Sequence, residues 1–235
     1  MQPINLIFEH ADFIIAEKPA NVNFHDEGNL DHGFFNQVKN HGKLQNRFTE
    51  LFPVHRLDKM TSGLLIFAKN LTTAQQFQTM FEQHKVEKYY LAVSNKKPKK
   101  KQGLIKGDME KSRRGMWKML RSQVNPAITQ FMSYSLNDGN RLYLLKPSSG
   151  KTHQLRVALS SIGSPILGDP LYATQHAYQE QRGYLHAYAL KFTLNLQTFQ
   201  YVLLPSFGDQ FLSEPCQQQL ERINEPWSLG WPNIN

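Results

Sequence analysis

Cysteine is almost absent from this 235-residue sequence, which contains Cys216 and no other. A single cysteine can form neither an internal disulfide nor a thiolate metal cluster, which excludes the disulfide-stabilised secreted class. Long apolar runs are absent as well, because the run 64–68 (LLIFA) is far shorter than the roughly 20 residues of a membrane-spanning helix. The opening residues, MQPINLIFEH, lack the order of basic, apolar and small residues that marks a secretory signal. We therefore expect a cytoplasmic protein that does not associate with membranes.

Clustered metal ligands are also lacking. The nine histidines are scattered, and no His-x-x-His or His-Glu-x-x-His pattern occurs. Metal sites in proteins gather several histidines or carboxylates around one ion. We therefore expect no bound metal.

Positive charge, in contrast, is concentrated in one segment. Residues 96–121 contain eleven lysines and arginines against two acids, a net charge of +9, whereas the remaining residues sum to −1. The run 95–101 (NKKPKKK) cannot pack a core, so it is either a solvated loop or an electrostatic arm for a polyanion such as RNA. The stretch 109–120 (MEKSRRGMWKML) interleaves cations with methionine and tryptophan. This mixture favours the RNA-binding interpretation, because a solvated loop kept extended by charge repulsion does not need large apolar side chains.

The hydrophobic pattern predicts an α+β fold. Asn70 is expected to cap a helix that runs to about residue 85, and a second helix is expected near 152–162, ended by Gly163. Strands that form hairpins beside a few helices, without strict βαβ alternation, are typical of this class. The expected strands are 12–17, 64–68, 88–94, 127–136, 141–146, 185–192 and 199–204.

Asp58 is the first candidate for chemistry, in the stretch HRLDKMTSG (55–63) just before the buried run. A carboxylate can serve as a base, a nucleophile or a metal ligand, and the lack of further ligands argues against a metal. Pairing with an arginine would keep the carboxylate charged and oriented. The structural alternative is an ordinary arginine–aspartate pair at the end of a loop, which is the more common arrangement.

Arg156 and Tyr90 are the next candidates. Arg156 follows the apolar Leu155 near the border of the buried face of its helix, so it could reach inward to a carboxylate or extend to solvent. Tyr90 lies on the minority face of its strand beside the small Ala92. A ring with open space beside it can stack on a nucleobase, and the alternative is a core tyrosine.

Taken together, these segments resemble the motifs of the RluA-type pseudouridine synthases. The resemblance covers roughly residues 10–205, and its specificity comes from the combination and order of the motifs. The matching segments are HRLDKMTSGLLIFAKN (55–70) for the catalytic motif, GKTHQLRVALSSIGSPILGDPLY (150–172), EKPANVNFHDE (17–27), KYYLAV (88–93) and LHAYALKF (185–192).

The resemblance implies a role for each candidate. Asp58 would be the essential catalytic carboxylate, and Arg156 would pair with it. Tyr90 would stack on the uracil and take part in proton transfer at its C5 atom, while Leu155 would pack beside the base. Arg56 would help to hold the RNA open once the target uridine is flipped out.

The resemblance also implies the fold and the reaction. The fold would be a mixed, mainly antiparallel sheet with flanking helices and a central RNA-binding cleft, with no metal or organic cofactor. The reaction would replace the N1–C1′ bond of a uridine in ribosomal or transfer RNA by a C5–C1′ bond, which requires the base to leave any helix. Asp58 would either attack the ribose carbon or remove a ribose proton, and the sequence leaves both routes open.

Two positions depart from the family pattern. Asn21 stands where glycine is usual, and the turn is expected to survive because asparagine tolerates a left-handed backbone. Lys151 stands where arginine is frequent. Lysine keeps the positive charge but lacks the forked, bidentate donors of a guanidinium.

We expect one catalytic domain over residues 1–235, with a basic insertion at about 95–121 and no separate RNA-binding domain ahead of residue 10. The RNA would then be held by Lys151 and by the cations of the insertion. The cations chosen are Lys97, Lys99, Lys100, Arg113 and Arg114.

We expect a monomer whose partner is RNA, with no obligate protein partner. An RNA-binding module that kept the fold and lost the chemistry would lack Asp58 or Arg156, and both are present. A hydrolytic glycosidase would need a second carboxylate, which no motif nominates. A chaperone of RNA folding would still function in the cell after Asp58 is replaced.

Overall fold

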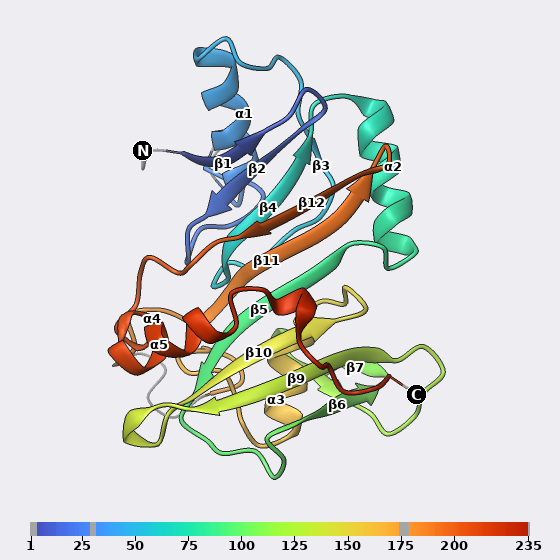
Figure 1. The fold of residues 1–235 in the computed structure, drawn as a ribbon. Helices are drawn as coiled ribbons and strands as arrows, with labels where there is room; N and C mark the ends of the chain where they lie inside the picture. The colour runs from blue at the N-terminus through green and yellow to red at the C-terminus, as the bar shows by residue number, and fades with distance from the viewer. Residues whose placement is uncertain (1–3, 29–31, 174–178, 235) are drawn as a thin grey trace. The chain divides into compact units, whose positions relative to one another are not determined.

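The computed structural model describes residues 4–28, 32–173 and 179–234. The chain forms two compact units, Met1–Val86 and Glu87–Asn235 (Figure 1). Each unit contains strands and helices of its own.

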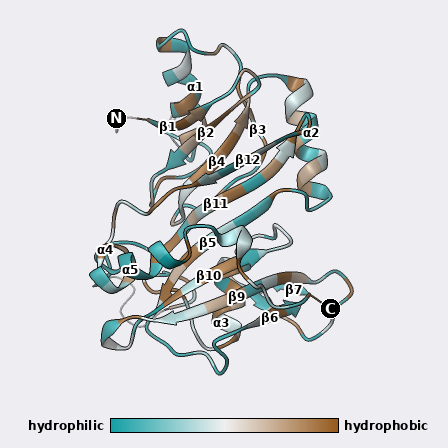
Figure 2. Ribbon diagram, in the orientation of Figure 1, coloured by the Kyte–Doolittle hydropathy of each residue, from teal (hydrophilic) through white to brown (hydrophobic). Residues whose placement is uncertain are grey.

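The first unit is built on an antiparallel sheet. Strand β1 (Asn5–Glu9) pairs with β2 (Phe13–Lys18), β2 pairs with β4 (Ser62–Ala68), and the short β3 (Phe52–Pro53) also pairs with β4. All seven residues of β4 are buried, and the strand is among the most hydrophobic parts of the ribbon (Figure 2). The buried strand predicted for 64–68 is therefore confirmed, and it begins two residues earlier.

Two helices complete the first unit, α1 (Phe34–Leu44) and α2 (Leu71–Glu82). The side-chain oxygen of Asn70 accepts a hydrogen bond from the backbone N–H of Thr73 (2.8 Å), which confirms Asn70 as the N-cap of α2. The helix ends at Glu82, three residues before the predicted end, because the chain turns through a left-handed His84 (φ 56°).

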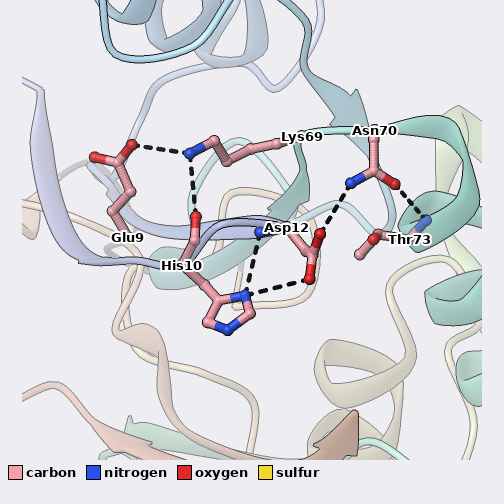
Figure 3. Close-up of polar contacts among 6 residues, drawn as sticks. All are labelled: Glu9, His10, Asp12, Lys69, Asn70 and Thr73. Carbon is pink, nitrogen blue, oxygen red and sulfur yellow. Dashed lines mark hydrogen bonds and ion pairs between the residues drawn. The ribbon is translucent and has the colours of Figure 1, made fainter. Parts of the chain in front are cut away.

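A polar cluster fixes the far end of β4 where the chain enters α2 (Figure 3). Lys69 Nζ contacts Glu9 Oε1 (3.0 Å) and the carbonyl oxygen of His10 (3.1 Å). Asn70 Nδ2 donates to Asp12 Oδ1 (3.2 Å). These bonds tie the end of β4 to the β1–β2 turn, so β4 is held by side chains as well as by its ladder.

The second unit contains a larger antiparallel sheet with the strand order β12–β11–β5–β10–β9–β6. The predicted hairpin is present, with Leu142 opposite Tyr134 across the turn Asn137–Gly139. The strands run over β5 (Glu87–Ser94), β6 (Gln102–Gly107), β9 (Ala127–Ser135), β10 (Arg141–Pro147), β11 (Leu185–Leu194) and β12 (Gln197–Val202).

The basic insertion is more regular than its composition indicates. Its strand β6 pairs with β9 in unbroken register. Strands β7 (Met109–Lys111) and β8 (Trp117–Met119) then form a separate two-stranded ribbon, whose tip is the 3₁₀ turn Arg113–Gly115. We call Met109–Met119 the cationic ribbon.

Helix α3 (Gln154–Ser161) packs against β8 and β9 in the second unit. Figure 1 shows α3 behind β9. The N–H of Gly163 donates to Ser160 O (3.0 Å) and the N–H of Ser164 to Leu159 O (3.0 Å), a Schellman motif that confirms Gly163 as the stop. The helix is shorter at its start than predicted, because His153 takes a left-handed conformation (φ 57°).

The C-terminal elements are α4 (Asp209–Leu212), α5 (Glu214–Arg222) and the 3₁₀ turn Pro226–Ser228. The segment that follows α5 runs back across β5, β10 and β9 (Figure 1), where Gln130 Nε2 donates to the carbonyl oxygen of Pro232 (2.5 Å).

The predicted α+β class is confirmed. Within each unit the strands described above pair antiparallel, and the helices are few and short. Across the part of the chain that the structure describes, no helix is both long enough and apolar enough to cross a membrane.

Candidate active site

Asp58 lies in the first unit on the loop that leads into β4. It is half-buried between the buried Leu57 and Met60, and its carbonyl oxygen accepts the N–H of Thr61 (3.0 Å). The neighbouring Arg56 is exposed. The loop therefore presents a carboxylate and a guanidinium from a short turn whose apolar residues point into the core.

A buried lysine holds this loop from below. Lys18 is 0% exposed, and its Nζ donates to the carbonyl oxygens of Pro19 (2.8 Å), Val22 (2.7 Å) and Lys59 (3.1 Å). An ammonium has three protons, so these three carbonyls satisfy it. Lys59 directly follows Asp58, so the ammonium fixes the backbone beside the candidate carboxylate.

The turn after Lys18 has the conformation expected from the sequence. Asn21 is left-handed (φ 65°), as the glycine usual at this position of the family would permit. The prediction that asparagine preserves this turn is therefore confirmed.

His55 anchors the start of the same loop. Its Nε2 accepts the N–H of Ile66 in β4 (3.0 Å), and its ring lies 4.9 Å from that of Phe81 in α2. The loop is thus attached at His55 and again at Lys59, with Asp58 between the two attachments.

Tyr90 belongs to β5 in the second unit and is half-buried. Its neighbour Tyr89 points to the other face of β5, where its ring meets Trp231 (5.7 Å) and its hydroxyl donates to Glu87 Oε2 (2.5 Å). Burial and the hydrogen bond to Glu87 raise the pKa of Tyr89. Tyr89 is therefore committed to the core, and Tyr90 is the tyrosine of this strand that remains partly accessible.

Lys88 shares the Tyr90 face of β5. Its Nζ lies 3.5 Å from the carbonyl oxygen of Ser149, at the start of the segment GKTHQLR. Burial lowers the pKa of Lys88 to about 8. The sequence did not single out Lys88, although it stands two residues from Tyr90.

Arg156 and Leu155 lie in the first turn of α3, and both are buried. Arg156 Nε donates to Asp169 Oδ2 (2.7 Å) and its Nη2 to Asp169 Oδ1 (2.8 Å), a bidentate pair with a carboxylate that is 0% exposed. The prediction that Arg156 reaches inward to a carboxylate is confirmed for Asp169. Its pairing with Asp58 stays a prediction.

Gln154 shapes the turn before α3. Its Oε1 accepts from Ser149 Oγ (2.7 Å) and from the N–H of Lys151 (3.0 Å), while its Nε2 donates to Ile128 O (3.0 Å). Lys151 is half-buried, and its Nζ donates to the carbonyl oxygen of Asn125. Lys151 therefore contacts the segment that follows the cationic ribbon.

The cations of the insertion are all exposed, including Lys97, Lys99 and Lys100 before β6 and Arg113 and Arg114 at the tip of the ribbon. Among the described residues, Lys118 is the member of this set that forms an ion pair, with Glu110 (3.0 Å). This surface carries strong positive charge with little internal compensation.

Besides Lys88, the sequence did not identify Lys18, Asp169 or Tyr172, whose ring lies 5.1 Å from the guanidinium carbon of Arg156. Each of the last three lies inside a segment that carries the family resemblance, in EKPAN or in GDPLY. Their position in the motifs was the available signal, but their partners are distant in the chain and no local pattern identifies them.

The fold of the chain is that of the pseudouridylate synthases. A solved structure titled Human RNA Pseudouridylate Synthase Domain Containing 1 superposes with a TM-score of 0.73 at 23% identity, covering 95% of this chain and 96% of that one. At this level of identity, the similarity establishes the fold.

The sequence establishes the family. The family described as RNA pseudouridylate synthase matches residues 12–161, which include Asp58, Tyr90 and Arg156. An "uncharacterized RNA pseudouridine synthase" of Haemophilus influenzae is 44% identical over 218 residues, covering 93% of this chain and 95% of the relative. The chain belongs to the RNA pseudouridylate synthase family, and its resemblance to the RluA-type enzymes is confirmed.

A second relative is longer than this chain. The "ribosomal large subunit pseudouridine synthase C" of Rickettsia bellii is 32% identical over 198 residues, covering 83% of this chain and 64% of the relative. The chain thus spans slightly less than two thirds of that protein.

Proposed function

We propose that this enzyme isomerises a specific uridine of ribosomal RNA to pseudouridine, with Asp58 as the catalytic carboxylate. The observation that carries the proposal is the position of Asp58, half-buried on a loop that Lys18 attaches to β2 and His55 attaches to β4. The name of the Rickettsia relative supports a ribosomal substrate. Transfer RNA is the alternative substrate.

The chemistry requires an ionised carboxylate beside the ribose. The N1–C1′ bond breaks, the uracil turns over and the C5–C1′ bond forms. C5 then loses its proton and N1 takes one up, so uridine and product have the same composition. Asp58 acts on the ribose by attack at C1′ or by removal of a ribose proton. Either route requires a charged Asp58, and Arg156 pairs with it to keep it charged and oriented.

The other residues handle the base and the RNA. Tyr90 stacks on the uracil and takes part in proton transfer at C5, and Leu155 packs beside the ring so that the detached base cannot escape. Arg56, exposed on the Asp58 loop, holds the RNA once the uridine has been everted into the central cleft.

The basic insertion holds the RNA backbone. Lys151 and the exposed cations of the insertion contact phosphates, which supplies affinity without base specificity. The cations concerned are Lys97, Lys99, Lys100, Arg113 and Arg114. We further propose that the enzyme acts as a monomer in the cytoplasm and without an obligate protein partner.

Mapping of pseudouridines tests the substrate. Carbodiimide labelling and primer extension on RNA from cells with and without the protein should show one or a few positions lost from ribosomal RNA. Re-expression of the wild-type chain should restore them, and Asp58→Asn should not.

Other outcomes reassign the function. Loss of a transfer RNA position, with ribosomal RNA unchanged, would replace the substrate and leave the chemistry. Normal growth and ribosome assembly restored by Asp58→Asn, without the modification, would favour an RNA-folding role over catalysis.

A further inference from the structure

Tyr172 contacts two elements of the second unit through two different parts of its side chain. Its hydroxyl oxygen accepts the backbone N–H of Trp117 in β8 (2.8 Å) and lies 3.1 Å from His153 Nδ1. Its ring lies 5.1 Å from the guanidinium carbon of Arg156 in α3. One side chain therefore bridges the cationic ribbon and the helix that carries Arg156.

The Arg156 side of this bridge is fully constrained. Asp169 fixes the guanidinium in its plane through two hydrogen bonds, and Tyr172 covers its face. The N–H of Tyr172 also donates to Asp169 Oδ1 (3.2 Å). The ring that covers Arg156 and the carboxylate that pairs with it therefore belong to one turn.

The ribbon side of the bridge is weak by itself. Strands β7 and β8 have three residues each, and a two-stranded ribbon of this size is marginally stable in water. Its tip is exposed and carries Arg113 and Arg114, and Lys111 lies 5.9 Å above the ring of Trp117. The hydrogen bond at the Trp117 N–H ties β8 to the turn after α3.

We infer that Tyr172 is a positioning residue that couples the cationic ribbon to Arg156. The inference rests on the proposed function, in which the ribbon grips RNA and Arg156 serves the catalytic carboxylate. When RNA holds the ribbon, the hydroxyl of Tyr172 transmits that placement to the start of α3, and the ring keeps Arg156 in its orientation. Tyr172 thus links grip and catalysis, in addition to the direct packing of α3 against β8.

Tyr172→Phe tests the tether directly, because it removes the hydroxyl and keeps the ring over Arg156. Hydrogen exchange of the backbone amides of 109–119 should accelerate in this variant, with the Trp117 amide affected most. Tyr134→Phe is the matched control, since the Tyr134 hydroxyl contacts Met132 Sδ at 3.4 Å and belongs to neither element. Unchanged exchange in Tyr172→Phe would overturn the tether, whatever reaction the enzyme performs.

A double-mutant cycle tests the coupling. At saturating RNA, Tyr172→Phe should lower the single-turnover rate about tenfold, because the start of α3 loses the placement that the hydroxyl transmits. In the background Arg113→Ala/Arg114→Ala, where RNA no longer engages the ribbon tip, the same change should cost less than about twofold. Tyr172→Leu also removes the aromatic ring over Arg156, so it should lower the single-turnover rate more than Tyr172→Phe does in both backgrounds.

Each result has a separate meaning. If Tyr172→Phe lowers the rate by the same factor in the wild-type and Arg113→Ala/Arg114→Ala backgrounds, Tyr172 acts independently of the ribbon. That result would overturn the coupling. Activity in Asp58→Asn, measured alongside, would overturn the proposed catalytic assignment, while the exchange measurement would still decide the tether.

Discussion

A buried ammonium group lies beneath the Asp58 loop, where Lys18 Nζ donates to three backbone carbonyls, including that of Lys59. A carboxylate used for catalysis must keep its position while the ribose arrives, because small displacements cost large factors in rate. The loop contributes little regular structure of its own, so this position depends on Lys18 and on His55 at its other end.

Lys18→Met should therefore impair both stability and activity. The change leaves three carbonyl oxygens without their donor in a buried site, with an expected loss of about 3 kcal/mol in the free energy of unfolding. The rate of pseudouridine formation should fall even at temperatures where the variant is fully folded, because the Asp58 backbone is released. Denaturant unfolding and single-turnover kinetics measure the two effects.

Lys69→Met is the matched control for that change. Lys69 also bonds a backbone carbonyl and pairs with Glu9, but its side chain is 16% exposed and it lies at the other end of β4. The expected loss is about 1 kcal/mol, with activity retained. Equal losses of activity in the two variants would contradict a specific role for Lys18 under the Asp58 loop.

At the scale of elements, the sequence predicted those whose signals are local. Asn70 as a helix cap, Gly163 as a stop and the five apolar residues 64–68 of β4 depend on neighbours within one turn or one strand. Helix α1 was missed because it starts after Gly33 without a capping side chain and contains Gly42 in its interior. The strands of the ribbon are too short to show periodicity.

The candidate site divides in the same way. Asp58, Tyr90 and Arg156 could be nominated because the motifs of the resemblance contain them. The roles of Lys18, Asp169 and Tyr172 depend on contacts between residues far apart in the chain, such as the hydrogen bond from Trp117 to Tyr172. Composition and spacing do not carry such contacts.

At the scale of elements, the prediction concerns RNA binding by the lysine-rich segment before β6. Replacement of its lysines by glutamine should weaken RNA binding and flatten the dependence of the affinity on salt, because fewer counterions are released. The residues replaced are Lys97, Lys99, Lys100 and Lys101, all exposed. If each contacts a phosphate, the slope of log K against log salt should fall by about 3.

The control for charge alone uses lysines of the first unit outside the proposed RNA surface, Lys39, Lys43 and Lys85. Their replacement should change the slope little. An equal effect per lysine in the two variants would show that only net charge matters, and an unchanged slope in the first would make the segment a spacer.

At the scale of the whole molecule, the pseudouridylate synthase fold carries Asp58, the carboxylate proposed for catalysis. The two units supply different parts of the proposed machinery: the first carries Asp58 and Arg56, and the second carries Tyr90, Leu155 and Arg156. The uneven distribution of charge fits a substrate that is a polyanion, since residues 96–121 hold the entire net positive charge.

The most direct test of the central claim uses the purified full chain with Asp58→Asn, which keeps the shape of the side chain and removes its charge. Ribosomal RNA labelled with tritium at C5 of uridine releases tritium when pseudouridine forms, and RNA affinity is measured in parallel. We predict a folded variant that binds RNA within about twofold of the wild-type affinity, as expected when only a catalytic charge is lost, and releases no tritium. Tritium release at the wild-type rate would contradict the assignment of Asp58 as the catalytic carboxylate.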